Sequence, residues 1–346
     1  MTASTSNVVK TSILGNVTLF AILGNVIVAY VLMKNRKILL RRRPTYQFIL
    51  NLTISDLVIC VLFCPFEMVR EALDSWIFGA ALCKIIEFVE ISTSGTTVMT
   101  HALIAIDRYR SLAHPFLPKL RPTLVKQMIA FSWLFPSFIA VPYLYMAEVV
   151  DVDHKPTCTP LAIPVLWLDN IFEAVVFALM FFLPLCVICW CYYHVLSITL
   201  GNTSNAQVVP PAEIALRRSQ KRVTRTACLI TVAFIICWTP TFVLSIRRIV
   251  LGTESVYHGD LLFEISFLGG LVNEATNPIL YTAYDRNMNV SQYIRCINRV
   301  SIDGGALTGP LDRPNEAPYS ANERFRQSCR KTTNPLRVTE SQPQIS

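Results

Sequence analysis

The sequence predicts an all-α membrane protein, a seven-transmembrane helix bundle followed by a short amphipathic eighth helix. Of its 346 residues, 53% are hydrophobic and 16% are charged, and the mean hydropathy is +0.45. Soluble domains seldom reach such values, whereas chains that cross a membrane several times do. Apolar runs of roughly 20 residues or more recur between short basic or polar breaks, and this is the spacing that a bilayer imposes.

The charges predict which side of the membrane each break faces. Lys34, Arg36, Lys37 and the run 41–43 form one basic break, which the positive-inside rule makes cytoplasmic. The N-terminus is then extracellular, and the later breaks alternate, mostly basic inside and acidic outside. A net charge of +8 distributed in this way indicates topology. We therefore expect a multi-pass protein of the plasma membrane in contact with lipid, and no nucleic-acid partner.

The first two spans are predicted at about Thr11–Met33 and Thr45–Val69. The first contains Asn25, and an amide in mid-membrane needs a partner on another helix. The second places Asp56 near the bilayer centre, where an acid costs roughly 2.5–3.5 kcal/mol on insertion scales. Pro65 should kink the outer part of this helix.

The third span, Cys83 to Tyr109, carries a polar seam. Glu90 and Arg108 are 18 positions apart, five full turns of helix, so they face the same way, and Thr97 and His101 lie close to that face. Ionisable groups on a membrane helix are costly and by default face a bundle interior. The seam therefore predicts that this helix is surrounded by others.

The remaining spans each carry a distinctive residue. They are predicted at about Leu124–Met146 with Trp133, Val165–Leu200 with Pro184, Val223–Val250 with Pro240, and Leu261–Tyr284. Pro240 should kink the sixth span. The seventh is the most polar and must line a cavity or pack on polar helices. The second outer loop, about 147–164, is acidic and holds Cys158.

These observations divide the chain into four parts. They are a short extracellular N-terminus (1–10), a seven-span domain (11–284), an amphipathic cytoplasmic helix (285–298) and a disordered cytoplasmic tail (299–346). The tail is rich in Ser, Thr, Pro and Arg and has few apolar residues, a composition that cannot bury a core.

Seven landmarks, one per span and in order, resemble the rhodopsin-like (class A) G-protein-coupled receptors. They are Asn25, Asp56, Asp107-Arg108-Tyr109, Trp133, Pro184, Cys237-Trp238-Thr239-Pro240 and Asn277-Pro278-Ile279-Leu280-Tyr281. The match covers about residues 10–298, and Pro65-Phe66 with Trp76-Ile77-Phe78-Gly79 looks like peptide-type receptors. The resemblance implies an extracellular ligand in an outer helical cavity, activation of heterotrimeric G proteins, and arrestin and receptor kinases as partners.

The family's roles carry over position by position. The resemblance implies a disulfide between Cys83 and Cys158, and an Arg108 that Asp107 holds at rest and that later meets the G protein beside Phe116. It also implies an activation switch made of Asp107, Arg108, Tyr109, Tyr192, Phe234, Trp238, Pro240, Asn277, Pro278 and Tyr281. Val98 and Pro184 resemble members of the packing relay between pocket and cytoplasmic half. Cys296 is expected to be palmitoylated.

Two departures from the family pattern carry predictions of their own. Gln220 stands where the family often has an acid facing Arg108, so we expect some ligand-independent signalling. Asp56, Thr97, Asn273 and Asn277 resemble the family's internal sodium site, with Glu274 in place of a small hydroxyl. We expect sodium to bind there and favour the inactive state; the alternative is that Glu274 hydrogen-bonds within the bundle and displaces the ion. No other cofactor is expected.

The expected ligand is cationic. Glu90 occupies the position where amine receptors carry Asp, and the other residues expected to bind ligand are Glu67, Glu87, Glu173, Trp238, Thr241, Phe242, Glu264 and Phe267. A wide negative mouth suits a larger cation such as a basic or amidated neuropeptide. A biogenic amine, a lipid or another small ligand is the alternative. Glu90 could instead form a structural ion pair with Arg247 or Arg248.

Other classes of protein are disfavoured. No Lys occurs from Arg222 through Arg330, so retinal has no attachment point in the seventh span. We expect no enzyme and no catalytic residue, because no metal-spaced His/Cys cluster, phosphate loop or Gly-x-Ser-x-Gly elbow is present. A channel or transporter with Asp56, Glu90 and Glu274 as an ion path would need repeated halves or a second acid-lined route, and the sequence has neither.

Overall fold

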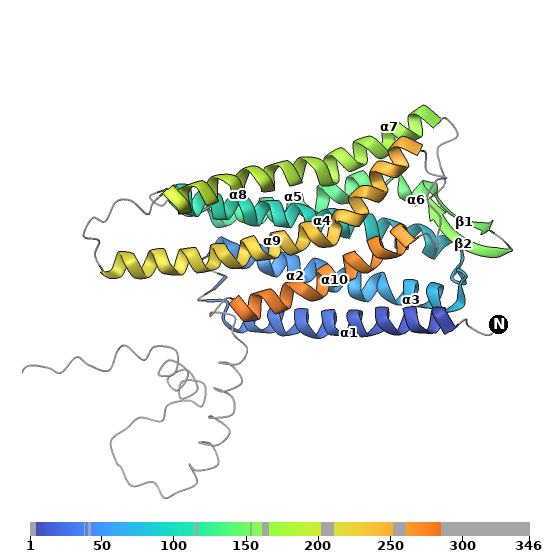
Figure 1. Cartoon of the computed structure of the whole chain (residues 1–346), viewed down its shortest axis with the longest axis horizontal. Coiled ribbons are helices and arrows are strands. Elements are labelled where there is room, and N and C mark those ends of the chain that lie inside the picture. Colours follow the sequence, from blue (N-terminus) through green and yellow to red (C-terminus); the bar gives the residue numbers. More distant parts are fainter. Residues whose placement is uncertain are drawn as a thin grey trace, which may run out of the picture. The chain divides into compact units, whose positions relative to one another are not determined.

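The computed structural model describes residues 5–37, 39–40, 43–114, 117–152, 154–160, 166–201, 211–251 and 261–284, all within one compact unit, Met1–Asp285. Long helices run side by side, and a single β-hairpin lies at one end of the bundle (Figure 1). The elements are α1 (Thr5–Lys34), α2 (Pro44–Leu62), α3 (Cys64–Leu73), α4 (Gly79–Ala113), α5 (Pro122–Ala140), α6 (Tyr143–Met146), β1 (Ala147–Val152), β2 (Lys155–Pro160), α7 (Leu166–Phe177), the π-helical η1 (Ala178–Phe182), α8 (Leu183–Gly201), α9 (Pro211–Leu251) and α10 (Leu261–Tyr284).

Helix α4 is the centre of the bundle. It packs against α2, α5, α8 and α9 (Figure 1). Thr97, His101 and Arg108 of the predicted polar seam are all buried, while Glu90 is half-buried. We name the two ends of the bundle after residues at the two ends of this helix: Cys83 marks the disulfide end and Arg108 marks the Arg108 end.

Five helical segments of the described chain are long and apolar enough to cross a membrane. They are Asn7–Lys34, Pro44–Leu73, Pro122–Met146, Trp167–Ile198 and Thr224–Leu251. Helices α4 and α10 have 35 and 24 residues and are therefore also long enough, but their polar side chains lower their hydropathy. A helix that other helices cover does not need to be apolar on every face.

Prolines interrupt two of the predicted spans. The second span is broken at Phe63, whose backbone angles are φ −110° and ψ −55°, so that α2 ends and α3 begins just before Pro65. The kink predicted there is therefore confirmed. In the fifth span, η1 precedes Pro184, which has no N–H to donate to the carbonyl four residues earlier.

Two helices extend past the apolar runs from which the spans were predicted. Helix α1 begins at Thr5, within the predicted 1–10 segment, and α9 begins at Pro211, within the stretch predicted as a cytoplasmic loop. The early part of α9 is rich in Ala, Leu, Arg, Gln and Lys, which favour helix in water as well as in a membrane. Hydropathy marks the membrane-crossing part of a helix and not its ends.

The stretch predicted as an acidic outer loop forms an antiparallel hairpin. Strands β1 and β2 pair in a register that places Val149 opposite Cys158 and Val152 opposite Lys155. His154, in the turn, has a φ of 63°. The hairpin was not predicted, because a two-stranded ribbon of six-residue strands leaves only a weak alternation of apolar and polar residues in the sequence.

Buried polar side chains connect the helices. Asn25 donates to the backbone carbonyl of Glu274 on α10 at 3.0 Å, which confirms that this amide needs a partner on another helix. Asn51 donates to the hydroxyls of Thr100 (2.8 Å) and Ser132 (3.2 Å) and accepts from the Trp133 indole at 2.8 Å, and these bonds tie α2 to α4 and α5. Such pairs satisfy polar groups that lipid cannot.

Candidate functional site

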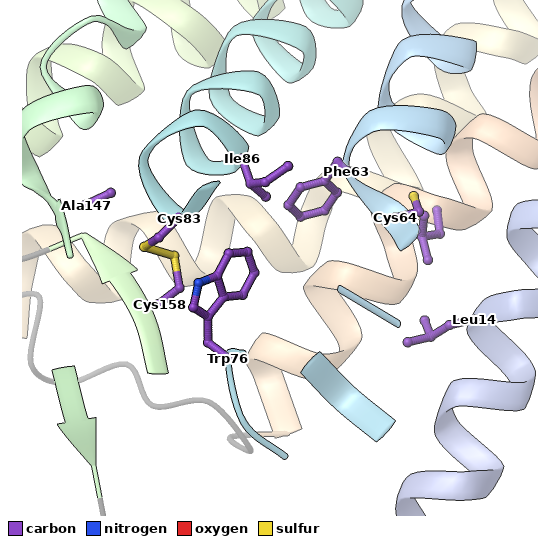
Figure 2. Close-up of a cluster of buried hydrophobic side chains, with 9 residues drawn as sticks. Leu14, Phe63, Cys64, Trp76, Cys83, Ile86, Ala147 and Cys158 are labelled. Carbon is purple, nitrogen blue, oxygen red and sulfur yellow. A yellow bond between two sulfur atoms is a disulfide. The ribbon is translucent and has the colours of Figure 1, made fainter. Parts of the chain in front are cut away.

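A disulfide fixes the hairpin over the bundle. Cys83 at the start of α4 is bonded to Cys158 of β2, with the two Cα atoms 5.6 Å apart, so the predicted pairing is confirmed. Trp76 is buried beside this bond (Figure 2). The Trp76 backbone N–H donates to the Pro156 carbonyl at 2.7 Å, and its indole donates to the Gly79 carbonyl at 2.9 Å.

A cavity of about 220 Å³ lies at this disulfide end. Its walls come from α2, α3, α4, α6, α7, η1, α9 and α10, together with β2. The lining residues are Ile59, Phe63, Glu67, Glu87, Glu90, Ile91, Ser94, Tyr143, Cys158, Thr159, Pro160, Glu173, Val176, Phe177, Phe181, Trp238, Thr241, Leu244, Ser245, Arg248, Phe263, Ser266, Phe267, Gly270, Leu271 and Glu274. An apolar pocket with a few convergent polar groups is the usual form of a ligand site.

The cavity gathers most of the residues predicted to bind ligand. Glu67, Glu87, Glu90, Glu173, Trp238, Thr241 and Phe267 all line it. Phe242 does not, and its ring packs instead against Phe177 and Phe181. Glu264 also stays outside the lining and pairs with Lys10 at 3.0 Å, while Lys10 reaches Glu71 at 3.2 Å. Phe242 and Glu264 therefore contact other residues of the bundle and do not line the cavity.

Arg248 is the basic residue of the lining, and it was not predicted to bind ligand. It lies on the face of α9 that also carries Trp238, Thr241 and Ser245. Counted from Trp238, Thr241 is three positions along the helix, Ser245 is seven and Arg248 is ten. Helical periodicity would have found it once Trp238 was placed in the pocket. Among the described residues, no ion pair within 4.0 Å joins Arg248 to Glu90, so the structure does not show the ion pair weighed for Glu90.

Aromatic packing lies at the floor of the cavity. Val98, Phe234 and Trp238 form one buried cluster, with Phe181 against it. The imidazole of His101 stacks on the Phe234 ring, with the centroids 4.3 Å apart. A change in the position of the Trp238 ring, which borders the cavity, therefore also displaces Phe234 and α4, because close-packed cores do not deform continuously.

A second polar cluster lies at mid-bundle. Asn277 donates to Asp56 at 3.0 Å, and Thr97 donates to the hydroxyl of Ser55 at 3.2 Å. Within this cluster, four buried oxygens have no hydrogen-bond partner among the described residues, and they are Asp56 Oδ1, Asn273 Oδ1, Glu274 Oε2 and Asn277 Oδ1. Carboxylate and amide oxygens are the donors that hard cations prefer, so these residues fit an internal sodium ion. Glu274 also lines the ligand cavity.

The Arg108 end is closed by a compact charged group. The Arg108 guanidinium lies 2.5 Å from Asp107 Oδ2, and the Thr45 hydroxyl donates to the same oxygen at 2.5 Å. All three residues are buried. Arg108 is therefore held by its sequence neighbour and by α2, and it is covered from contact with a partner.

The other predicted switch residues are distributed along the bundle. Tyr192 accepts a hydrogen bond from Thr231 at 3.1 Å, whereas the buried Tyr281 hydroxyl has no hydrogen-bond partner in the described part of the chain. Tyr109 packs against Trp190, with centroids 4.9 Å apart. The Cβ and Cγ of Pro278 would lie 2.8 and 2.9 Å from a Cβ at Gly24, so α10 touches α1 at that point.

Some predicted features lie outside the described residues. Phe116, Cys296, the amphipathic helix 285–298 and the tail 299–346 belong to this group. The backbone of Gln220 lies in α9, and its side chain is outside the described set.

A helical membrane bundle with an acidic cavity under a disulfide-anchored hairpin, and a covered arginine at the opposite end, has the construction of a receptor. The family of rhodopsin-type seven-transmembrane receptors matches residues 24–281, which is more than half of the chain. The chain therefore belongs to this family, and it is a membrane-embedded signalling receptor. Family membership also removes the channel and transporter alternative.

Proposed function

We propose that this protein is a plasma-membrane G-protein-coupled receptor with an extracellular N-terminus and a cationic ligand. The acidic cavity is the observation that carries the proposal. Glu87, Glu90 and Glu173 line the cavity at the disulfide end, with Trp238 at its floor. Preformed carboxylates in a low-dielectric cavity favour ammonium and guanidinium groups.

The ligand proposed first is a basic or amidated neuropeptide. The acids of the cavity, together with Glu71 and Glu148 near the same end, would attract a positively charged peptide and increase its association rate. A biogenic amine is the second candidate, since Glu90 lies on α4 and reaches the cavity. Activation would release Arg108 from Asp107 for a heterotrimeric G protein. Arrestin and receptor kinases are proposed as later partners.

The test is a G-protein activation assay in transfected cells. Wild type is compared with Arg108→Ala, first without ligand and then against pools of basic peptides and amines. Lys126→Ala serves as the control, because Lys126 is an exposed cation at the same end of the bundle. Signal that wild type and the control share and that Arg108→Ala lacks supports the proposal. A surface-expressed wild type that is silent in every G-protein channel contradicts it.

Sodium binding at the mid-bundle cluster is proposed as a regulator of this receptor. The four unpartnered oxygens around Asp56 and Glu274 support it. A bound cation would compensate two neighbouring carboxylates and hold α2 against α10 in the resting state. Purified receptor should unfold at a higher temperature in sodium than in potassium, and Asp56→Asn should remove the difference. Equal unfolding temperatures in both salts would instead support a Glu274 that hydrogen-bonds within the bundle.

A further inference from the structure

The ligand cavity holds more acid than base. Two of the five glutamates in the cavity lining already have partners within the protein. Glu67 is paired with Arg70 at 2.7 Å, and the Glu274 side chain interacts with Asp56 in the mid-bundle cluster. Glu87, Glu90 and Glu173 remain, and Arg248 is the cation that lines the cavity with them. Three carboxyl groups facing one guanidinium leave two acidic groups without an internal counterpart, and these can ionise when a ligand brings cationic groups beside them.

Arg248 offsets this charge without occupying any of the three carboxylates. Its charge acts on Glu87, Glu90 and Glu173. Among the described residues, however, no ion pair within 4.0 Å involves it, and its buried Nε has no hydrogen-bond partner. The carboxylates therefore stay available to a ligand, while the total charge that the ligand must bring is set in part by Arg248.

The available acids lie on two different walls. Glu87 and Glu90 are separated by one turn on α4, whereas Glu173 comes from α7, and only 8% of its surface is exposed. A single cation placed at one wall leaves the other wall uncompensated, and an uncompensated buried charge is costly. Two cationic groups joined by a short chain can satisfy both.

The size of the cavity limits what carries those charges. At about 220 Å³ it lies below the 300–1,000 Å³ usual for drug-sized ligands. It therefore admits one residue or a small molecule and excludes a folded peptide. This limit and the surplus of acidic groups point to the same chemical group.

We infer that the group seated in this cavity is a compact dication, with two cationic groups on one short chain, and that Arg248 sets this charge requirement. The inference rests on the ligand site proposed above. A free diamine has this chemistry, and so does an N-terminal Arg or Lys residue of a peptide, through its α-ammonium and side chain. Each places one charge near Glu87 and Glu90 and the other near Glu173.

Binding to the purified full-length receptor tests this inference without any need for signalling. Agmatine carries two cationic groups, and N-acetylagmatine is the same molecule with one of them removed. A ligand that binds the folded state raises its unfolding temperature. Agmatine should produce the same shift in unfolding temperature as N-acetylagmatine at about one tenth of the concentration or lower. A tenfold difference corresponds to about 1.4 kcal/mol in binding free energy. Glu90→Gln and Glu173→Gln should each reduce this preference.

Arg248→Gln provides the decisive variant. Removing the internal cation should strengthen binding of N-acetylagmatine, because a further carboxylate is then uncompensated. Arg247→Gln is the matched control, since Arg247 is the neighbouring residue and is not part of the cavity lining. It should leave both dissociation constants at their wild-type values.

Three results would overturn the inference. They are equal stabilisation by agmatine and N-acetylagmatine, no stabilisation by either, or stronger binding of arginine, which is agmatine with an added carboxylate. The last result would make Arg248 an anion-binding residue. The peptide Arg-Gly-Gly-amide and its N-acetylated form separate the two sources, because only a cavity open to peptides distinguishes them. Selective binding without G-protein activation would sustain the inference and contradict the proposed function.

Discussion

The two ends of the bundle handle buried charge in opposite ways. At the Arg108 end, Asp107, Arg108 and Thr45 form one compact group with contacts of 2.5 Å, and every member is buried. At the disulfide end, Glu87, Glu90, Glu173 and Arg248 share a cavity, and no ion pair within 4.0 Å among the described residues involves them.

Under the proposed function, this difference would distinguish a closed switch at the Arg108 end from an open binding site at the disulfide end. A pair that is already satisfied stabilises one arrangement and must be broken before either partner can act elsewhere. Carboxylates held apart by rigid helices remain ready for a ligand that supplies the missing charge. Under the proposed function, α4 and the Trp238–Phe234 core would link the filling of the cavity to the release of Arg108, because they lie between the two sets of charges.

The largest effect is expected from loss of the disulfide, which acts on one end only. Cys83→Ser opens a link between residues 75 positions apart, and chain entropy predicts a loss of about 4 kcal/mol. Thermal unfolding of purified receptor measures it, with Cys186→Ser, an exposed free cysteine, as the control. Arg108-dependent basal signalling per folded molecule should stay at the wild-type level. An equal loss of that signalling would show that the two ends are not separable.

The next effect is expected where α9 meets α10, between the two ends. A Cβ at Gly269 would lie 2.3 Å from the Cys237 carbonyl oxygen, so Gly269→Ala forces the helices apart and should cost about 1–3 kcal/mol. A Cβ at the neighbouring Gly270 meets nothing within 4 Å. Gly270→Ala should therefore leave the unfolding temperature unchanged or raise it, and similar losses in both variants would contradict the close contact.

The substitution Thr45→Val tests whether the Thr45 hydroxyl helps to hold Arg108 in its buried position. The hydroxyl donates to Asp107, and a hydrogen bond to a charged group contributes about 1.5–3 kcal/mol. Its loss weakens the arrangement that holds Arg108, so basal G-protein signalling should rise several-fold. Thr53→Val is the control, because the Thr53 hydroxyl bonds only to the Ile49 carbonyl of its own helix. Basal signalling that is unchanged by Thr45→Val would show that Asp107 alone holds Arg108.

The smallest effect is expected from a single hydrogen bond between α2 and α5. Trp133→Phe keeps the ring but removes the donor to Asn51, which should cost about 1 kcal/mol. The unfolding temperature should fall slightly, whereas ligand preference and basal signalling should stay at their wild-type levels. A selective loss of either function would mean that Asn51 belongs to the switch and not to the scaffold alone.

Sequence patterns were sufficient for the parts of the fold that a bilayer dictates. The positions of the spans, the central place of the third span and the kink before Pro65 all follow from hydropathy, polar spacing and proline chemistry. The disulfide followed from the resemblance to the family and not from spacing. Helix ends, as at Thr5 and Pro211, did not follow, because they depend on local helix propensity outside the membrane.

The site was predicted less evenly. Acids on the spans predicted a negative mouth, and Glu67, Glu87, Glu90 and Glu173 indeed line one cavity. Glu264 has the same chemistry, yet it pairs with Lys10. One sequence gives no means to separate these two outcomes, since the partner lies 254 positions away in the chain.

The sequence by itself determined a receptor-type membrane bundle, because spans, charge asymmetry and the landmark residues are local properties of the chain. Only the tertiary structure decided which charges are paired. Asp107 and Arg108 pair with each other and with Thr45 from α2, and Glu264 pairs with Lys10. Arg248 lines the cavity with three glutamates and forms no ion pair with any residue that the structure describes. The physical reason is that the energy of a buried charge depends on the distance to its partner, and packing of helices far apart in the chain sets that distance.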